Sequence, residues 1–170
     1  MDKLWAPWRI KYIRAPKEKG CVFCTKSEPG DDRDNLVLFR GQNSFILMNL
    51  YPYSNGHLMI APYQHTSETT DLSRTTNTEI MTLVNQSMEI LKTTMKAEGF
   101  NFGANLGKAA GAGIEEHLHY HVVPRWTGDT NFMPVLGHAK VMVEGLQETW
   151  DILIPHYNKQ IGRASCRERV

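Results

Sequence analysis

The segment HLHYHVV, residues 117–123, places three histidines at every second position. Because side chains alternate between the two faces of a β-strand, His117, His119 and His121 are expected to share one face. Neutral imidazole is a nucleophile and titrates near physiological pH, so a row of these rings suits an extended anion such as a polyphosphate. One ring can attack phosphorus while its neighbours donate hydrogen bonds or protons.

A metal site is the alternative reading of the same spacing. Side chains on one face of a strand lie roughly 6.5–7 Å apart, whereas metal–ligand bonds are about 2 Å long. Three consecutive rings therefore do not converge easily on one ion, but two of them can. A metal hydrolase that uses His117 and His119 as an HxH pair stays open on this ground.

Two cysteines form a second candidate site. Cys21 and Cys24 lie in CVFC, and the N-terminal segment has no continuous apolar core ahead of a small-residue cleavage site. In a chain without an export signal, this spacing indicates metal or redox chemistry rather than a disulfide framework. The pair can fill two corners of a tetrahedral zinc site, which then needs two further ligands. A reduced pair without metal is the alternative.

Five short segments are expected to form the sheet that positions these residues. Residues 35–40, 44–49 and 57–62 are rich in β-branched and aromatic residues and are separated by turn-forming sequences, which is typical of an antiparallel meander. Residues 100–105 and 117–124 supply two further strands, joined by a glycine-rich loop. In the last strand, the residues between the histidines are expected to face the core; they are Leu118, Tyr120 and Val122.

Helical periodicity appears in residues 75–99, where apolar residues recur at spacings of three and four. Thr76 and Glu79 have the spacing of a capping box, and Gly99 can end the helix. A short C-terminal helix is expected around residues 143–153. The predicted fold is α+β, a five-stranded, mostly antiparallel sheet with a long helix on one face.

Composition limits the function classes. The chain has 170 residues, 41% of them hydrophobic and 22% charged, which fits one globular domain. Its longest apolar runs are far short of a membrane span, so we expect a cytoplasmic protein without a membrane partner. The formal net charge of +1 gives no electrostatic reason for nucleic-acid binding.

The last ten residues, IGRASCRERV, differ in character from the rest. They can be encoded by a sequence that resembles sequencing-adaptor read-through, so we hypothesise that residues 161–170 are not native. The single domain then covers residues 1–160, including an N-terminal arm. Without this tail Lys+Arg falls from 19 to 16 and Asp+Glu from 18 to 17, so the formal charge becomes −1.

The segment GAGIEEHLHYHVVPRW resembles the motif of the histidine triad superfamily, H-φ-H-φ-H-φ-φ with φ apolar, whose members are nucleotidyl hydrolases and transferases. Other stretches resemble its bacterial diadenosine polyphosphate hydrolase or phosphorylase branch; they are LWAPWRIKYI, CVFC, NLYPYSNGHLMIAP, FNFGANLGKAAGAG and GDTNFMPVLG. The likeness covers essentially residues 3–155. It implies the α+β fold and a homodimer, with no organic cofactor.

The resemblance assigns roles to individual residues. It implies that His119 is the nucleophile and that His121 and His57 contact the scissile phosphate. Asn49 matches the position that holds the ribose hydroxyls. The remaining substrate-binding positions would cradle phosphate oxygens, and they are Asn105, Gly111 and Gly113.

In the zinc-bearing members of the superfamily, two histidines complete the metal site. Here they would be His65 and His117, joining Cys21 and Cys24 in a structural zinc site. Such a site would remove His117 from proton transfer.

The leading function is therefore transfer of a nucleotidyl group from a dinucleoside polyphosphate through His119 to water or phosphate. Hydrolysis of nucleoside phosphoramidates is the second enzymatic alternative. A non-catalytic nucleotide-binding interaction protein is the alternative of another class, although binding alone needs no nucleophile at position 119.

Overall fold

The computed structural model describes residues 20–129 and 144–167, with side chains described through Lys159. The predicted N-terminal arm lies outside the described residues, as do residues 168–170. The elements in chain order are α2 (Val22–Ser27), β1 (Val37–Arg40), β2 (Ser44–Met48), β3 (Leu58–Pro62), the 3-10 helix η1 (Thr69–Asp71), α3 (Arg74–Met95), β4 (Gly99–Gly103), the 3-10 helix η2 (Lys108–Ala110), β5 (Tyr120–Arg125) and α5 (Leu146–Arg167).

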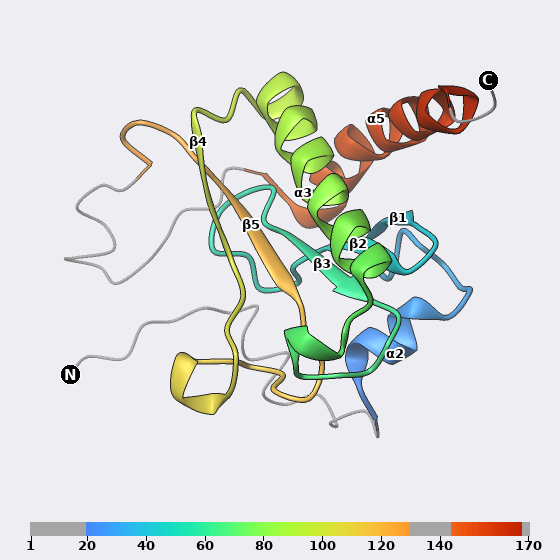
Figure 1. Ribbon diagram of the computed structural model, residues 1–170. Helices are drawn as coiled ribbons and strands as arrows, with labels where there is room; N and C mark the ends of the chain where they lie inside the picture. The colour runs from blue at the N-terminus through green and yellow to red at the C-terminus, as the bar shows by residue number, and fades with distance from the viewer. Residues whose placement is uncertain (1–19, 130–143, 168–170) are drawn as a thin grey trace, which may run out of the picture.

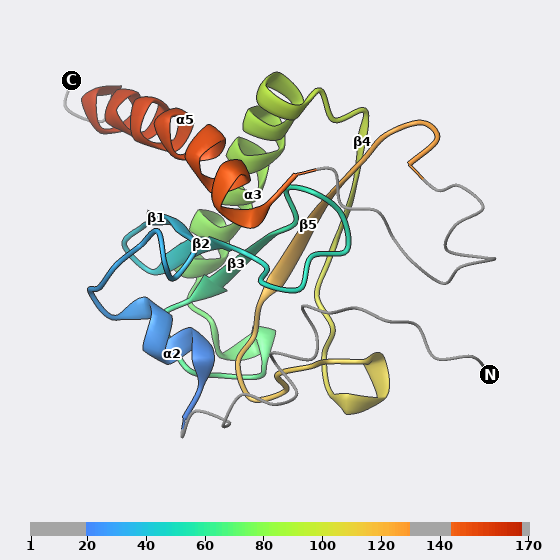
Figure 2. The same ribbon diagram turned by 180° about the vertical axis from the view of Figure 1, so that it is seen from behind.

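The five strands form one antiparallel sheet in the order β1-β2-β3-β5-β4, which confirms the predicted fold class. Helix α3 lies across one face of this sheet (Figure 1). Helix α5 packs against α3 and beside β1 (Figure 2). Because β3 and β5 run antiparallel, the end of β3 and the loop that follows it lie next to the histidine segment that leads into β5.

Both faces of the sheet are covered at β2, which explains why this strand is buried at every position instead of alternating. One face packs with α3 and α5 into a main core, which includes Leu38, Ile46, Met48, Ile60, Val122, Ile80, Leu83, Val84, Leu91, Leu153 and Tyr157. The opposite face forms a second core with α2, which consists of Phe23, Val37, Phe45, Leu47 and Ala61. Helix α2 therefore joins the fold on the face opposite α3.

The ends of α3 differ from the sequence prediction. The helix begins at Arg74, because the side chain of Ser73 accepts a hydrogen bond from the backbone N–H of Thr76 at 3.0 Å. The predicted capping box of Thr76 and Glu79 is thus wrong. The helix ends at Met95, where Lys96 adopts the left-handed conformation, and Gly99 opens β4 instead of ending the helix.

Glu79 binds the turn between β1 and β2 instead of capping α3. Its carboxylate accepts hydrogen bonds from the backbone N–H groups of Gln42 and Asn43 and from Asn43 Nδ2, at 2.7, 2.8 and 2.7 Å. A side chain at Gly41 would collide with this carboxylate. The absence of a side chain at Gly41 therefore leaves room for the Glu79 carboxylate to bind the turn between β1 and β2.

We expect Gly41→Ala to destabilise the protein by about 2–3 kcal/mol, because the new methyl group displaces the Glu79 carboxylate and leaves turn donors without a partner. Urea denaturation monitors this loss. Gly30→Ala is the control, since a methyl group there makes only ordinary contacts, the nearest at 3.5 Å. Equal urea midpoints for the two variants would contradict this account of the turn.

The C-terminal helix is longer than predicted, since α5 continues through Pro155 to Arg167. Two features hold it to the body. Trp150 Nε1–H donates to the backbone oxygen of Val37 at 2.9 Å, and the buried hydroxyl of Tyr157 donates to Ser87 Oγ at 2.8 Å. None of the described helices combines the length and the apolar character needed to cross a lipid bilayer.

Candidate active site and metal cluster

The structure places the histidine segment as predicted on one face, but β5 begins only at Tyr120. Leu118, Tyr120 and Val122 pack on the main core, which confirms the predicted alternation. The strand starts late because the preceding backbone bonds elsewhere: the N–H of Leu118 donates to the oxygen of Thr66 at 2.7 Å. The predicted strand over 117–124 is therefore wrong at its beginning.

A backbone hydrogen bond decides which ring nitrogen of His119 is unprotonated. Its Nδ1 lies 2.8 Å from the backbone oxygen of His117, and because a carbonyl oxygen only accepts, Nδ1 carries the proton. Nε2 of the neutral ring then carries the lone pair. Burial lowers the pKa of His119, so the ring is neutral at pH 7. A buried, neutral imidazole held by the backbone oxygen of His117 can act as a positioned nucleophile.

His57 and His121 form a second, directly bonded pair. The backbone N–H of Tyr53 donates to His57 Nδ1 at 3.0 Å, so this nitrogen accepts and Nε2 carries the proton. His57 Nε2 lies 2.9 Å from His121 Nδ1 and donates to it. The remaining proton of a neutral His121 is therefore on Nε2. The His119 and His121 rings meet edge to face with centroids 4.9 Å apart, which places the two imidazoles in direct contact.

Two aromatic residues border these rings. The ring of Phe23 lies 4.6 Å from that of His119 and 5.1 Å from that of His117, between centroids. Tyr53 lies 4.6 Å from His57 on the same measure and is 54% exposed. Sequence reasoning assigned neither residue a part in the site. Two features of the sequence could have indicated them: Phe23 lies inside CVFC, and Tyr53 lies four residues before His57.

The four predicted metal ligands lie together. Their ligand atoms are all within 4.8 Å of one another, in the set Cys21, Cys24, His65 and His117. Cys21 Sγ is 3.2 Å from His117 Nδ1, and Cys24 Sγ is 3.3 Å from His65 Nδ1. These separations fit the edges of a small tetrahedron of soft sulfur and imidazole ligands. The cluster can hold a metal ion.

A hydrogen bond at Nε2 orients the ring of His117 so that its Nδ1 faces the cysteines. Nε2 lies 2.9 Å from the backbone oxygen of Pro62 and donates to it. Nδ1 is then the unprotonated nitrogen, and it is the one that faces the two sulfur atoms. A ligating histidine commonly has such a second hydrogen bond, which fixes its tautomer.

The predicted substrate-binding residues occupy different places. The amide of Asn49 contacts His57 directly, with Nδ2 3.3 Å from His57 Nδ1, and its Oδ1 accepts from the backbone N–H of Tyr51 at 2.9 Å. Asn105, Gly111 and Gly113 lie in the loop between β4 and β5. Because Gly103 pairs with His121, Asn105 follows two residues beyond the end of β4 that borders the histidines. The phosphate-binding role of this loop stays a prediction.

Acid pH is expected to destabilise the protein through His121. Burial lowers its pKa from 6.5 to about 4, with the neighbouring His119 ring as the second cause, and His57 and Tyr53 also border it. Between these values the unfolded chain binds more protons than the folded one. The free energy of unfolding is therefore highest above pH 6.5 and falls as the pH drops toward about 4.

Urea denaturation between pH 7 and pH 4 tests this expectation. His121→Gln lacks the titrating ring, so its stability should depend less steeply on pH in this window. Identical slopes for the wild type and the variant would show that His121 is not the titrating group.

Residues 31–128 match the sequence model of the HIT domain, and the chain therefore belongs to the HIT family. This confirms the resemblance to the histidine triad superfamily. A Mycobacterium tuberculosis protein named AP-4-A phosphorylase is 37% identical over 168 residues, which cover 94% of this chain and 86% of that protein. The bis(5'-adenosyl)-triphosphatase of Dictyostelium discoideum is 28% identical over 93 residues, which cover 55% of this chain and 62% of that protein.

Comparison of structures supports the same fold. A Zn-bound histidine triad family protein from Mycobacterium smegmatis superposes with a TM-score of 0.67 at 23% identity. The superposition covers 85% of this chain and 97% of that one. At this level of identity the likeness establishes the α+β architecture.

Proposed function

We propose that this protein cleaves dinucleoside polyphosphates at the α-phosphorus by transferring a nucleotidyl group first to His119 and then to phosphate or water. The observation that carries this proposal is the hydrogen bond from His119 Nδ1–H to the backbone oxygen of His117, which leaves Nε2 as a neutral nucleophile. The 37% identity to a protein named AP-4-A phosphorylase supports the substrate class and favours phosphate as the acceptor.

In the first step, the lone pair on His119 Nε2 attacks the α-phosphorus. A phosphorus–nitrogen bond forms, and the bond from the α-phosphorus to the bridging oxygen breaks with its electron pair leaving on the polyphosphate. With diadenosine tetraphosphate the leaving group is ATP and the enzyme carries AMP on His119. The Nδ1 proton stays on the ring, where the oxygen of His117 stabilises the positive charge that develops.

His121 stabilises the charge on the phosphate during this step. The hydrogen bond from His57 occupies Nδ1 of His121, so Nε2–H of His121 remains available as a donor. The His121 ring is in contact with the ring of the nucleophile, His119. A donor oriented before the reaction costs no reorganisation when charge develops on the phosphate oxygens. His57 and the backbone N–H of Tyr53 fix the tautomer of His121 through two successive hydrogen bonds.

The environment of His117 favours anhydrides over phosphoramidates. Its Nε2–H is bonded to the oxygen of Pro62 and its Nδ1 faces the cysteines, so neither nitrogen offers a proton to a leaving group. A polyphosphate departs as a stable anion, whereas an amine must be protonated to depart. This difference supports dinucleoside polyphosphates as the leading substrates.

The donor set of the metal cluster fits zinc, which accepts two thiolates and two imidazoles in a closed tetrahedral site. Zinc held by Cys21, Cys24, His65 and His117 would be structural, because four protein ligands leave no position for substrate. These residues join α2 to the segment that contains the nucleophile. Zinc bound there would hold these segments together and would supply no step of the reaction.

Product analysis tests the proposed function. The wild type is incubated with diadenosine tetraphosphate, with and without inorganic phosphate. ADP plus ATP that appear only with phosphate would identify a phosphorylase, because phosphate then accepts the AMP group. AMP plus ATP without phosphate would identify a hydrolase. The absence of turnover under both conditions would reject dinucleoside tetraphosphates as substrates and favour phosphoramidates, tested with adenosine 5'-phosphoramidate.

We also propose a homodimer, while the expected cytoplasmic location stays a prediction. Strand β4 is an edge of the sheet and β-strand edges readily pair with another chain. Phe102 on this strand is 40% exposed and Met81 on α3 is 44% exposed, so apolar surface is available on both elements. Light scattering after size exclusion should give twice the mass of the chain, and a monomer at micromolar concentration would contradict the proposal.

A further inference from the structure

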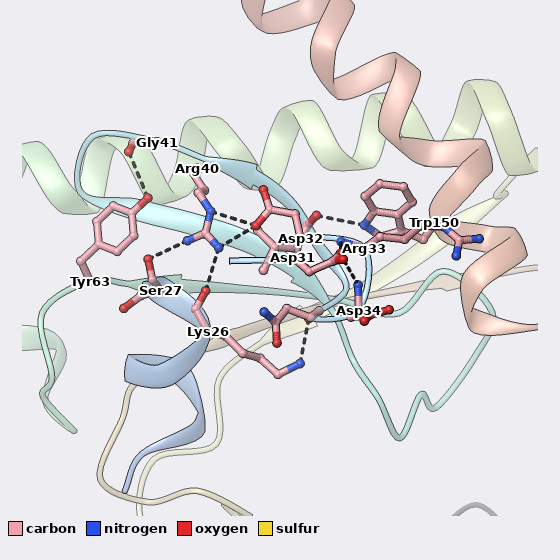
Figure 3. A network of polar contacts seen from close by, with 12 residues as sticks. Lys26, Ser27, Asp31, Asp32, Arg33, Asp34, Arg40, Gly41, Tyr63 and Trp150 are labelled. Carbon is pink, nitrogen blue, oxygen red and sulfur yellow. Dashed lines mark hydrogen bonds and ion pairs between the residues drawn. The ribbon is translucent and has the colours of Figure 1, made fainter. Parts of the chain in front are cut away.

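Helix α2 is short and depends on other segments for its position. It has six residues, too few for a stable isolated helix. The Arg40 guanidinium donates to the backbone oxygens of Ser27 and Lys26 at 2.6 and 3.0 Å, and Asp32 accepts from the same guanidinium at 2.7 Å (Figure 3). Lys26 Nζ donates to the backbone oxygen of Asn35 at 2.7 Å. The C-terminal end of α2 is thus fixed to the segment around β1.

The fixed helix holds Phe23 inside the second core. This side chain is 1% exposed and packs with Val37, Phe45, Leu47 and Ala61 on the face of the sheet opposite α3. Among the described residues of that core, it is the one whose ring contacts the histidines. Phe23 therefore connects the apolar packing of α2 to the site.

The His119 ring is held from three directions. Its Nδ1–H is bonded to the backbone oxygen of His117, the edge of its ring meets His121, and the Phe23 ring lies 4.6 Å away at an angle of 33°. The hydrogen bond fixes one atom of the ring but permits rotation about the donor direction. The Phe23 contact limits that rotation, and with it the direction of the lone pair on Nε2.

We propose that Phe23 is a positioning residue for His119: by packing against the imidazole, it directs Nε2 toward the α-phosphorus. This inference rests on the proposed nucleotidyl transfer. Misplacement of a reacting atom by about 1 Å can reduce the rate roughly 100-fold. Because Phe23 is buried and contacts the nucleophile from the protein side, its loss should affect the chemical step and leave substrate binding unchanged.

Phe45 supplies a matched control. It belongs to the same second core and is fully buried, but its ring stacks on Tyr63 at a centroid distance of 5.5 Å. Replacement of either phenylalanine by leucine removes the same atoms from the same core. A comparison of Phe23→Leu with Phe45→Leu therefore separates loss of packing from loss of the contact with His119.

Steady-state kinetics with diadenosine tetraphosphate give the first readout. We expect Phe23→Leu to lower kcat by roughly 10- to 100-fold with KM within about twofold of the wild type. Phe45→Leu should lower the melting temperature by a similar amount and leave kcat within about twofold. An equal fall of kcat in both variants would attribute the effect to a softened core and overturn the proposal.

Nitrogen-15 NMR of the histidine rings gives a readout that does not require turnover. In the wild type and in Phe45→Leu, His119 should show a protonated Nδ1 and an unprotonated Nε2. In Phe23→Leu we expect these signals to shift toward the average of the two tautomers. Unchanged signals together with an unchanged kcat would overturn the positioning role. If the wild type fails to turn over any nucleotide, the proposed function fails, while the NMR comparison still decides whether Phe23 orients His119.

Discussion

Replacement of His119 by alanine is expected to lower nucleotidyl transfer by roughly 10⁴-fold or more, in line with the loss of a covalent nucleophile in other enzymes. The physical reason is that the Nε2 lone pair is the group that forms the bond to phosphorus. Alanine removes it and leaves His121 and His57, which can bind a phosphate but form no covalent intermediate. Substrate binding should therefore survive while turnover is lost.

Two measurements check this expectation. Rapid-quench kinetics follow ATP release in a single turnover, and intact-protein mass spectrometry after acid-free quenching detects the nucleotidyl group on the wild type. Neither signal should appear with His119→Ala. His156→Ala is the control, because His156 is exposed on α5, and it should retain wild-type activity. A variant lacking His119 that still forms the covalent adduct would assign the nucleophile to another residue.

The second large effect concerns the metal cluster. We expect His65→Gln to lower the melting temperature by roughly 10 °C, because a ligand bound only by the folded chain stabilises it by about 4 kcal/mol at a thousandfold excess over its dissociation constant. His65 is exposed, so its replacement removes little packing. The fall in melting temperature should therefore report the loss of bound metal and not a loss of core packing.

Calorimetry with parallel metal analysis tests this effect. The wild type should contain about one zinc per chain, and a chelator should lower its melting temperature to that of His65→Gln. His156→Gln, a substitution of the same type on an exposed helix position, should change neither quantity. Purified wild-type protein that contains no metal, and whose melting temperature a chelator leaves unchanged, would show that the cysteines and histidines form an ordinary polar cluster.

Local patterns were sufficient to predict the architecture, whereas the gathering of the four metal ligands was predicted only with the help of the family resemblance. The alternation in HLHYHVV predicts which side chains face the core, and the main core contains Leu118, Tyr120 and Val122 as expected. The spacing of CVFC and the family resemblance together predict the four residues of the metal cluster. The catalytic roles of His119, His121 and His57 stay predictions until they are tested by substitution.

Contacts between distant segments account for what the sequence did not predict. Glu79 lies three residues after Thr76, as a capping residue would. Its carboxylate instead binds three donors in a turn 36 residues away in the sequence, and Ser73 caps the helix. Strand β5 begins late because Leu118 bonds to the loop at Thr66. Phe23 contacts a histidine 96 positions later. A local pattern contains no information about which distant backbone groups or rings will be neighbours.

The distances along the chain between the parts of the site also determine when it can form. Cys21 meets His117 across 96 positions, His57 meets His121 across 64, and His117 meets Pro62 across 55. Closing such loops costs entropy that is recovered only when the contacts form, so we expect these contacts to form late in folding. The meander of β1, β2 and β3 can assemble from local turns before β5 arrives. Refolding protein should therefore regain much of its secondary structure before it regains the ability to bind phosphate, and the competent site marks completion of the native state.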